Sequence, residues 1–341
     1  MITVGSLFAG IGGICLAFNN GKSHVVWANE IDPIASKTYR ENFNHDLYEG
    51  DINDFILKAK KREFTFPQVD ILTAGFPCQA FSIAGYQKGF EDDRGNLFFS
   101  ILEVVKLIRP KALFLENVKN LRSHDKGRTF KIIKNSLLDL GYTFNDFVFN
   151  TMTYSNIPQN RERIFMISFD KTDKDLNIER FTEGELGLLL HIDPIPLTKT
   201  IHDLIEPEKQ DEIYYYKPDS KIYPELKSSM TNRDTIYQWR RVYVRENQNN
   251  VCPTLTANMG TGGHNVPLII DDFGIRKLTP RECARFQGFP DSFKFPKIAN
   301  SHLYKQIGNS VSIPLIGRLA DKMIDILTGE VSLEDNLLLD L

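Results

Sequence analysis

The chain has 341 residues, 42% of them hydrophobic and 25% charged, with a formal net charge of −3. These values are typical of a globular protein, and they exclude a chain that binds polyanions through a uniformly basic surface. The sequence has no apolar run long enough to span a bilayer, and residues 1–5 lack the basic and apolar regions that are typical of a signal peptide. Its four cysteines form no Cys-x-x-Cys pair, so neither a zinc site nor a disulfide framework is indicated. We therefore expect a cytoplasmic protein without a metal site.

The first 30 residues predict the start of a nucleotide-binding unit. Residues 2–8 are typical of a strand, residues 9–13 of a glycine turn and residues 14–18 of a helix. Glycines let the backbone approach a cofactor closely. A second strand, residues 24–30, ends in Glu30, where a carboxylate can bind both hydroxyls of a ribose. The spacing G-x-G-G differs from the G-x-G-x-x-G of dinucleotide enzymes, and the G-K-[ST] of a phosphate loop is absent.

Two residues after this strand are candidates for contacting an adenine ring. Ile31 offers an apolar face next to Glu30. Asp51 either accepts a hydrogen bond from the adenine amino group or caps the helix that follows, and taken alone the cap is the more common role.

Cys78 stands at the carboxyl end of a predicted buried strand, residues 69–73, where α/β sheets bind their ligands. Gly75 and Pro77 break this strand, and a polar segment with glycines, residues 82–89, follows. A free thiol in a reduced protein is most often a buried structural residue. The flanking proline, glycine and loop instead favour an exposed thiol, so both interpretations stay open at this point.

A glutamate and two arginines belong to later strands. Residues 112–115 predict a buried strand that delivers Glu116 to the same edge of the sheet as Cys78. A glutamate is expensive to bury unpaired, so Glu116 needs a partner or a substrate. Arg161 and Arg163 lie two residues apart in an extended segment and therefore point the same way.

The alternation of strands and helices predicts a large part and a small part. It continues through strands at residues 145–150 and 163–168 and stops near residue 171. Residues up to about 270 are polar and contain prolines, and residues 237–245 interleave arginines with aromatic side chains. That pattern suits contacts to DNA grooves and phosphates, although it also fits an ordinary surface hairpin.

Regular structure resumes after the small part. Thr279 and Glu282 form a capping box that opens a helix ending near Phe286, and a last helix is expected from Ser312 to Leu327. Earlier in the chain, the basic residues between positions 119 and 134 are most simply a solvated helix face.

Six short motifs occur in order along the chain. They are Phe8-Ala9-Gly10-Ile11-Gly12-Gly13, Gly75-Phe76-Pro77-Cys78-Gln79, Glu116-Asn117-Val118, Gln159-Asn160-Arg161-Glu162-Arg163, Arg281-Glu282-Cys283-Ala284-Arg285 and Gly308-Asn309-Ser310-Val311. With them the sequence resembles the DNA (cytosine-5) methyltransferases of bacterial type II restriction–modification systems. One such motif arises by chance, whereas six in order, over residues 3–311, are very specific.

The resemblance implies an α/β fold: a Rossmann-like S-adenosylmethionine-dependent methyltransferase fold with a mixed, mostly parallel sheet. It also implies a smaller, irregular, β-rich target-recognition domain. We expect the catalytic, cofactor-binding domain at residues 1–189 and the target-recognition domain at residues 190–270. Residues 271–341 then return to the catalytic domain and include the C-terminal helix.

The resemblance further implies methyl transfer to C5 of a cytosine flipped out of the duplex. Cys78 then adds to C6, because a thiolate there pushes electron density onto C5. Glu116 acts as a general acid toward ring N3, and Arg163 and Arg161 hold the base carbonyl and the adjacent acid. The catalytic candidates are therefore Cys78, Glu116, Arg161 and Arg163.

The implied methyl donor is S-adenosyl-L-methionine, with S-adenosyl-L-homocysteine as its product, and no metal takes part. In the family pattern the glycine turn surrounds the methionine, Glu30 binds the ribose and the segment at Asn309 closes the pocket. The cofactor-binding candidates are Phe8, Ala9, Gly10, Ile11, Gly12, Gly13, Glu30, Ile31, Asp51, Ile52, Gly75, Pro77, Leu97, Asn309, Ser310 and Val311.

The implied partner is double-stranded DNA, bound by a monomer that works beside a companion restriction endonuclease. The recognition segment resembles those of enzymes for short GC-rich sites such as GGNCC or GGWCC, and the loop from Ser82 to Arg94 is expected to close over the flipped base. The candidates for DNA contact are Ser82, Ile83, Ala84, Arg240, Arg241, Arg245, Thr254 and Leu255.

Other activities fit less well. A tRNA cytosine-5 methyltransferase shares the motifs, but the long recognition segment favours DNA. An N4-cytosine or N6-adenine methyltransferase needs a [DSN]-P-P-[YFW] loop, which is absent. The function of a nicotinamide dehydrogenase would give Cys78 and Glu116 no role. A catalytically silent DNA-binding module would not need Cys78, Glu116 or Arg163.

Overall fold

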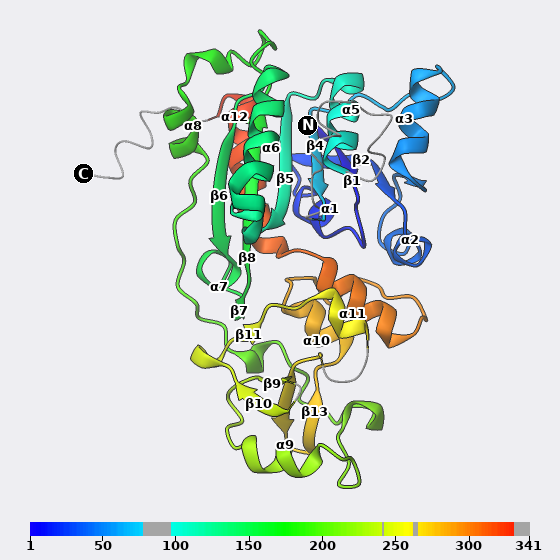
Figure 1. Cartoon of the computed structure of the whole chain (residues 1–341), viewed down its shortest axis with the longest axis vertical. Helices are drawn as coiled ribbons and strands as arrows, with labels where there is room; N and C mark the ends of the chain where they lie inside the picture. Colours follow the sequence, from blue (N-terminus) through cyan, green and yellow to red (C-terminus); the bar gives the residue numbers. More distant parts are fainter. Residues whose placement is uncertain (78–96, 241, 262–264, 331–341) are drawn as a thin grey trace, which may run out of the picture.

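The computed structural model describes residues 1–77, 97–240, 242–261 and 265–330. Its larger half is built on a seven-stranded sheet with the strand order β3-β2-β1-β4-β5-β8-β6 (Figure 1). The first five strands in this order are parallel, whereas β8 is antiparallel to both of its neighbours. The expected mixed, mostly parallel sheet is therefore confirmed. The strands are β1 (Ile2–Leu7), β2 (Ser23–Glu30), β3 (Asp46–Glu49), β4 (Ile71–Gly75), β5 (Ala112–Val118), β6 (Asn145–Asn150) and β8 (Glu162–Phe169).

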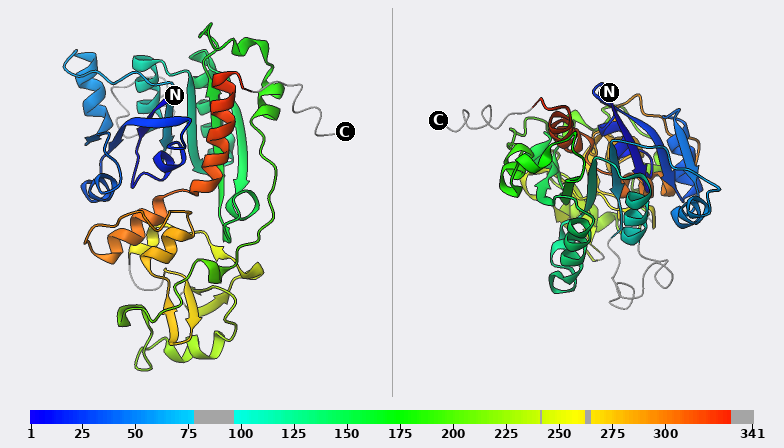
Figure 2. Two further views of the ribbon diagram at one scale, coloured as in Figure 1. Left: turned by 180° about the vertical axis from the view of Figure 1, so that it is seen from behind. Right: turned by 90° about the horizontal axis from the view of Figure 1, so that it is seen from above.

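Helices cover both faces of this sheet, because its central strands are apolar on both sides. In β5, Leu113 and Leu115 point into one core and Phe114 into the other, and all three are fully buried. One face carries α3 (Ile52–Lys60), α5 (Leu97–Ile108) and α6 (Arg128–Asp139). The opposite face carries α1 (Gly13–Ala17), α2 (Pro33–Arg40) and α12 (Ile313–Thr328), as Figure 2 shows from behind.

The strand order reverses at β1, which has β2 on one side and β4 on the other. In open α/β sheets this reversal leaves a crevice at the carboxyl ends of the two diverging strands, and ligands bind there. The segments that leave β1 and β4 at this point are the glycine turn and residues 75–77.

Two helices lie where we expected the alternation of strands and helices to have stopped, beyond residue 171, and one of them, α9 (Tyr223–Ser229), belongs to the smaller half. The other lies before that half. It is α8 (Glu183–Leu189), which begins with a capping box between Thr182 and Glu185 and buries Leu186 and Leu189. From α8 an irregular segment runs along one side of the molecule to the smaller half (Figure 1).

The smaller half contains a four-stranded antiparallel sheet with the order β10-β9-β12-β13. It has a small core of its own, made by Leu226, Met230, Tyr237, Leu268 and Ile275. The β12–β13 hairpin crosses residue 270, where we expected this part to end, so we propose a boundary after residue 277. The elements are α9 (Tyr223–Ser229), β9 (Tyr237–Arg240), β10 (Tyr243–Glu246), β12 (Leu268–Asp271) and β13 (Gly274–Lys277).

Between the halves lie α10 (Pro280–Arg285) and α11 (Asn300–Asn309), and the chain then returns to the large sheet through α12 (Figure 1). The predicted capping box at Thr279 is confirmed. A two-stranded parallel pair, β7 (Gln159–Asn160) with β11 (Cys252–Pro253), also links the halves. The remaining elements are α7 (Thr151–Tyr154) and the 3₁₀ turns η1 (Lys119–Arg122), η2 (His124–Gly127), η3 (Ile178–Arg180), η4 (Ile201–Asp203), η5 (Glu212–Tyr214), η6 (Gln248–Asn250) and η7 (Ala257–Thr261). No helix in the described ranges is long and apolar enough to cross a bilayer.

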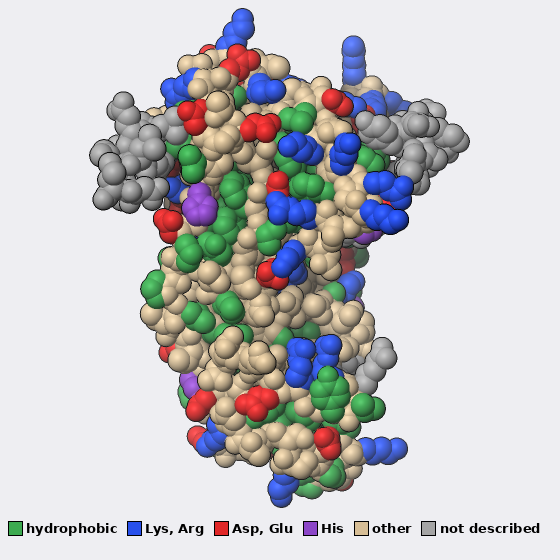
Figure 3. Space-filling view, turned by 60° about the vertical axis from the view of Figure 1, so that its left-hand side comes forward, with side chains coloured by type: hydrophobic (Ala, Val, Ile, Leu, Met, Phe, Trp, Pro, Cys, Tyr) green, Lys and Arg blue, Asp and Glu red, His purple; other side chains and the backbone are tan. Residues whose placement is uncertain are grey.

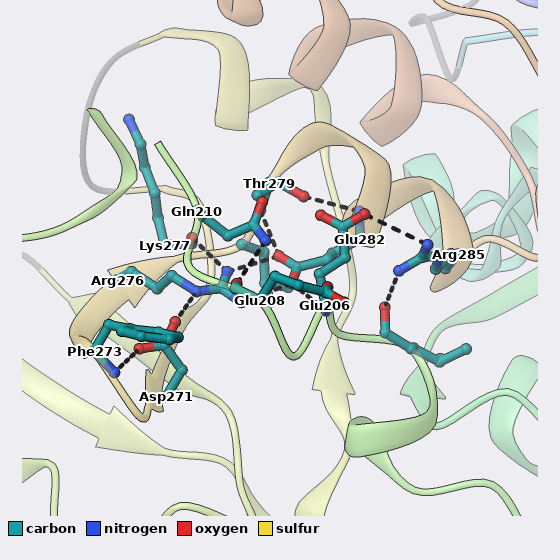
Figure 4. A network of polar contacts seen from close by, with 12 residues as sticks. Glu206, Glu208, Gln210, Asp271, Phe273, Arg276, Lys277, Thr279, Glu282 and Arg285 are labelled. Carbon is teal, nitrogen blue, oxygen red and sulfur yellow. Dashed lines mark hydrogen bonds and ion pairs between the residues drawn. The ribbon is translucent and has the colours of Figure 1, made fainter. Parts of the chain in front are cut away.

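A buried ionic network joins the small sheet to α10 (Figure 4). Arg276 of β13 is fully buried. It donates to Asp271 at 2.5 Å and to both oxygens of Glu282 at 2.7 and 2.8 Å. Glu282 also accepts from the backbone N–H groups of Thr279 and Glu206, at 2.7 and 2.8 Å. These directional bonds fix the angle between the hairpin and the helix.

Arg276→Met should unfold at a much lower urea concentration than the wild type, because it leaves two buried carboxylates without their cation. The expected loss is about 3–5 kcal/mol. Arg233→Met is the matched control, since Arg233 pairs with Asp272 on the surface of the same half, where the two side chains are 52% and 76% exposed. That control should lose less than about 1 kcal/mol. Equal losses in the two variants would contradict a special role for the buried network.

Candidate active site

A cavity of about 360 Å³ opens at the carboxyl ends of the central strands. Its wall is made by the ends of β2, β4 and β5, by the segments that follow β1, β2 and β4, by the start of β8, and by α11 and the α11–α12 connection. The structure thus brings together residues more than 300 positions apart in the sequence. The cofactor candidates that line it are Phe8, Ala9, Gly10, Ile11, Gly13, Glu30, Gly75, Pro77, Asn309, Ser310 and Val311.

The glycine turn lets the backbone itself form one wall. Gly10 and Gly12 adopt left-handed φ values of 58° and 89°. A Cβ on Gly12 would lie 2.2 Å from the ring of Phe43, and one on Gly13 would lie 2.4 Å from Ser310 Oγ. Gly12 therefore faces the core behind the turn, while Gly13 allows the turn to touch the α11–α12 connection.

Glu30 is held in place at the edge of the cavity. Its side chain is buried, one oxygen accepts from the Gly10 N–H at 2.7 Å and the other from the Asp32 N–H at 2.8 Å. Burial raises the pKa of Glu30, and these two backbone hydrogen bonds limit the rise. Each carboxylate oxygen keeps a second lone pair, so Glu30 can still accept two hydrogen bonds from a ligand.

Buried Glu116 and half-buried Arg163 form an ion pair at the cavity. Glu116 Oε1 lies 3.1 Å from Arg163 Nε, with the two side chains 10% and 15% exposed. The pairing of β5 with β8 explains this contact: Val118 stands opposite Arg163, so Arg163 is a diagonal neighbour of Glu116 on one face. Asn117 donates to the carbonyl of Phe76 at 2.7 Å and thereby ties β5 to the end of β4, just before Pro77.

Arg161 also lines the cavity, but its hydrogen bonds go elsewhere. The guanidinium is buried and donates to the carbonyl oxygens of Leu255, at 2.7 Å, and Ser310. Its Nε has no hydrogen-bond partner. Burial, and then the nearby charge of Arg163, lower the pKa of Arg161 to about 9. Of the two predicted arginines, Arg163 is therefore the one that contacts the acid.

Four predicted cofactor residues other than Gly12 lie outside the cavity lining. The Ile31 side chain is 62% exposed, and Ile52 is buried at the start of α3. Asp51 caps α3 by accepting from the Asn53 N–H at 2.9 Å, which is the alternative role that the sequence left open. Leu97 is the first residue of α5 and packs against the core between α5 and the sheet.

Several predicted residues fall outside the described ranges: Cys78, Ser82, Ile83, Ala84 and Arg241. The three cysteines within those ranges, Cys15, Cys252 and Cys283, are all buried. Burial raises the pKa of each of these thiols, so they are poor nucleophiles. The same ranges contain no group of three or more His, Cys, Asp or Glu side chains that could hold a metal.

The remaining DNA candidates lie on the smaller half and its link to the large sheet. Arg240 and Arg245 are exposed on the β9–β10 hairpin, where Arg245 donates to Gln238. Thr254 donates to the carbonyl of Asn160 at 2.6 Å, and Leu255 is buried.

The basic segment at residues 119–134 is partly neutralised. Lys119, Arg122 and Arg128 form ion pairs with Glu162, Asp146 and Asp125. Figure 3 shows that lysines and arginines are spread over one face of the large half with carboxylates among them. The paired side chains agree with the simple interpretation of a solvated surface.

Sequence reasoning assigned no role to three residues that shape the site. Asp32 and Lys305 form an ion pair of 3.4 Å at the cavity, and Gln159 is fully buried. Asp32 caps α2 directly before Pro33, a helix-start pattern that the sequence does contain. Gln159 belongs to the fourth motif, but no local pattern shows what its side chain contacts, since its partners lie about 100 residues away or more.

A doubly covered α/β sheet with a glycine turn at its switch point and an acid–arginine pair beside it is an arrangement typical of enzymes that bind nucleotide-like cofactors. The sequence pattern of C-5 cytosine-specific DNA methylases matches residues 2–325. The chain therefore belongs to this family and is a DNA (cytosine-5) methyltransferase.

Two curated relatives illustrate this membership. The chain is 49% identical to Type II methyltransferase M.Bsp6I of Bacillus sp. (strain RFL6), over 95% of this chain and 98% of the relative. It is 39% identical to Type II methyltransferase M.HhaI of Haemophilus parahaemolyticus, over 92% and 91% of the two chains.

Solved structures support the fold. A putative DNA modification methyltransferase encoded within a prophage of E. coli matches with a TM-score of 0.66 at 22% identity, over 96% of this chain and all of that one. The Dnmt2 methyltransferase of S. pombe matches with a TM-score of 0.66 at 17% identity, over 97% and 99% of the two chains. At these identities the likeness concerns the fold alone.

Gly12→Ala should destabilise the protein by about 2–4 kcal/mol in urea unfolding, because the new Cβ has a left-handed φ and meets the Phe43 ring. Substitutions of two other glycines distinguish the cost of the left-handed φ from the cost of the steric clash. Gly21 has φ 87° with nothing within 4 Å, so Gly21→Ala should lose only about 1–2 kcal/mol. Gly317 lies in α12 with open space around it, so Gly317→Ala should gain about 0.5–1 kcal/mol. A neutral Gly12→Ala would show that the turn is not constrained.

Proposed function

We propose that the protein transfers a methyl group from S-adenosyl-L-methionine to C5 of a flipped-out cytosine within a short specific sequence of duplex DNA. The reaction passes through a covalent bond between Cys78 and C6 of the base. The observation that carries this proposal is the ion pair of buried Glu116 with Arg163 at the cavity, which Pro77, the residue before Cys78, also lines. Protection of host DNA from a companion restriction endonuclease is the setting that the type II relatives suggest.

The cavity fits the proposed cofactor. Glu30 keeps two free lone pairs for the ribose hydroxyls. The left-handed glycines let backbone N–H and carbonyl groups face the methionine, and Ser310 and Val311 close the opposite side. When bound, S-adenosyl-L-methionine supplies an electrophilic methyl group on a sulfonium.

Cys78 is the proposed nucleophile. Its sulfur adds to C6, and the electron pair of the C5–C6 double bond moves toward C5, which then bonds to the methyl carbon as the S–CH₃ bond breaks. Loss of the C5 proton to a base and breakage of the C6–S bond restore the aromatic ring and free the enzyme. The other three cysteines are buried away from this role.

Glu116 and Arg163 stabilise the addition. Glu116 gives or shares a proton with ring N3 as electron density builds up there, and the positive charge of Arg163, whose Nε lies 3.1 Å from Glu116 Oε1, is next to this carboxyl group. The same arginine is placed to donate to the base carbonyl. Because Glu116 is buried and Arg163 is half-buried, these interactions meet little competition from water.

The smaller half is the proposed target-recognition part. Arg240 and Arg245 project from its exposed hairpin, and with Arg241 they are candidates for contacts to guanine or phosphate. Thr254 lies where this half joins β7, directly before the catalytic strand β8. Ser82, Ile83 and Ala84 follow Cys78 and are candidates for contact with the DNA around the flipped base.

Purified protein with tritiated S-adenosylmethionine and genomic duplex DNA, followed by bisulfite sequencing, tests this function. Wild type should label C5 within one short repeated sequence, and Cys78→Ser should label nothing while still binding the cofactor. Label on tRNA but not on DNA would contradict the recognition proposal. If neither DNA nor tRNA is labelled although the protein binds the cofactor, the proposed enzymatic activity would be contradicted.

Glu116→Gln should lower kcat by about 10²- to 10⁴-fold with little effect on DNA affinity, because glutamine keeps the shape but cannot transfer a proton. Glu162→Gln is the control, since Glu162 lies one residue from Arg163 but pairs with Lys119 on the surface. Single-turnover methylation of a short duplex measures both variants. A near-normal rate for Glu116→Gln would remove Glu116 from the chemistry.

A further inference from the structure

One buried side chain connects two remote parts of the chain. Arg161 donates to the carbonyl oxygens of Leu255 and Ser310, which are 94 and 149 residues away in the sequence. Leu255 belongs to the segment that enters from the smaller half, and Ser310 belongs to the α11–α12 connection that lines the cavity. Arg161, the residue between β7 and β8, thus contacts both the link to the small half and the cavity wall.

Residues 159–161 contact the segment that enters from the smaller half, residues 252–255, at several points. Gln159 and Asn160 pair as β7 with Cys252 and Pro253 of β11. Thr254 donates to the Asn160 carbonyl at 2.6 Å, and the Leu255 N–H donates to the Gln159 side chain at 3.2 Å. Among these contacts, the Arg161 side chain is the one that also reaches the cavity wall.

The cavity wall at Ser310 is packed between the incoming segment and the glycine turn. A Cβ on Gly308 would lie 2.1 Å from the carbonyl carbon of Thr256, so these two backbones touch. On the other side, Ser310 Oγ lies 2.4 Å from the position of a Gly13 Cβ. A shift of the α11–α12 connection must therefore move Thr256, the glycine turn, or both.

The chemistry of Arg161 favours a role in holding these parts together over a role in simple stabilisation. Its cation is buried against two neutral carbonyl groups, and its Nε is unpartnered. Burying a charge without a carboxylate is costly, and an apolar side chain would fill the space more cheaply. Only the planar guanidinium fork can donate to two carbonyls at a fixed angle at once.

We propose that Arg161 is a positioning residue that joins the Thr254–Leu255 segment to the Ser310 wall, so that cofactor binding and DNA binding favour each other. The inference rests on the proposed function, because it takes the cofactor to bind against Asn309–Val311 and DNA to bind near Thr254. A cofactor that orders this wall orders the Thr254–Leu255 segment through Arg161. DNA then binds a segment that is already fixed, and the coupling is reciprocal.

The test measures the affinity of S-adenosylhomocysteine with and without a duplex that carries the sequence found by bisulfite sequencing. In wild type the duplex should tighten binding by about tenfold, within the usual range for coupled sites. Arg161→Met should reduce this factor to about twofold or less, and Arg161→Lys, which reaches one carbonyl, should fall between. Arg318→Met is the control, because Arg318 also donates to a carbonyl, that of Tyr154 at 2.8 Å, but away from the cavity.

Two outcomes would overturn the proposal. A purely structural residue would lower the melting temperature and weaken each ligand while leaving the coupling factor unchanged. A residue that touches the base would lower kcat and likewise leave the coupling factor unchanged.

If Arg161→Met does not fold, hydrogen exchange on the wild type still tests the proposal. S-adenosylhomocysteine alone should slow exchange at residues 255–257, and unchanged exchange there would also overturn the proposal. Failure of wild type to bind S-adenosylhomocysteine would instead contradict the proposed function.

Discussion

The site depends on one antiparallel strand in an otherwise parallel arrangement. Because β8 runs opposite to β5, its first residues lie beside the last residues of β5, at the edge where β1 and β4 also end. Arg163 thereby becomes the diagonal neighbour of Glu116, and their opposite charges lie 3.1 Å apart at the cavity. A parallel strand in this position would place its first residues at the opposite edge of the sheet and leave Glu116 without its cation.

The two halves of the molecule are joined by polar contacts as well as by apolar packing. Arg276 ties the small sheet to α10, and Gln159 ties the end of α10 to β7 by donating to the Phe286 carbonyl. Arg161, two residues after Gln159, donates to the Ser310 carbonyl and so extends these polar contacts to the cavity wall. Apolar contacts tolerate sliding, whereas hydrogen bonds and ion pairs have preferred directions. A protein that must place one base against one cofactor gains from such fixed geometry.

Much of the large half could be predicted from the sequence, because its signals are local. Apolar strands, the glycine turn, the capping box at Thr279 and the last helix all follow from residues close to one another. The helix α8 was missed although Thr182 and Glu185 form the same kind of cap, since its short apolar face lies in a polar region. The end of the small part was placed at residue 270, inside the β12–β13 hairpin. The amino-acid composition changes there, but the strand pairing of β12 with β13 continues across that position.

The fine structure of the site could not be predicted in the same way. The sequence placed Arg161 and Arg163 side by side, and no local pattern distinguishes the arginine that meets Glu116 from the one that meets two carbonyl groups. Those partners depend on strand pairing and on segments about 100 residues away or more. Ile31, Asp51, Ile52 and Leu97 were assigned by family pattern, and the structure places them outside the cavity lining.

The most direct test of the central claim is to trap the bond between enzyme and base. A duplex in which 5-fluorocytosine replaces the target cytosine should block release, because the fluorine at C5 cannot leave as a proton does. With S-adenosylmethionine present, intact-protein mass spectrometry should show the protein plus one DNA strand plus one methyl group, and peptide mapping should place the link on Cys78. Full methylation activity on ordinary DNA without any trapped complex, or a link to another residue, would contradict the proposed mechanism.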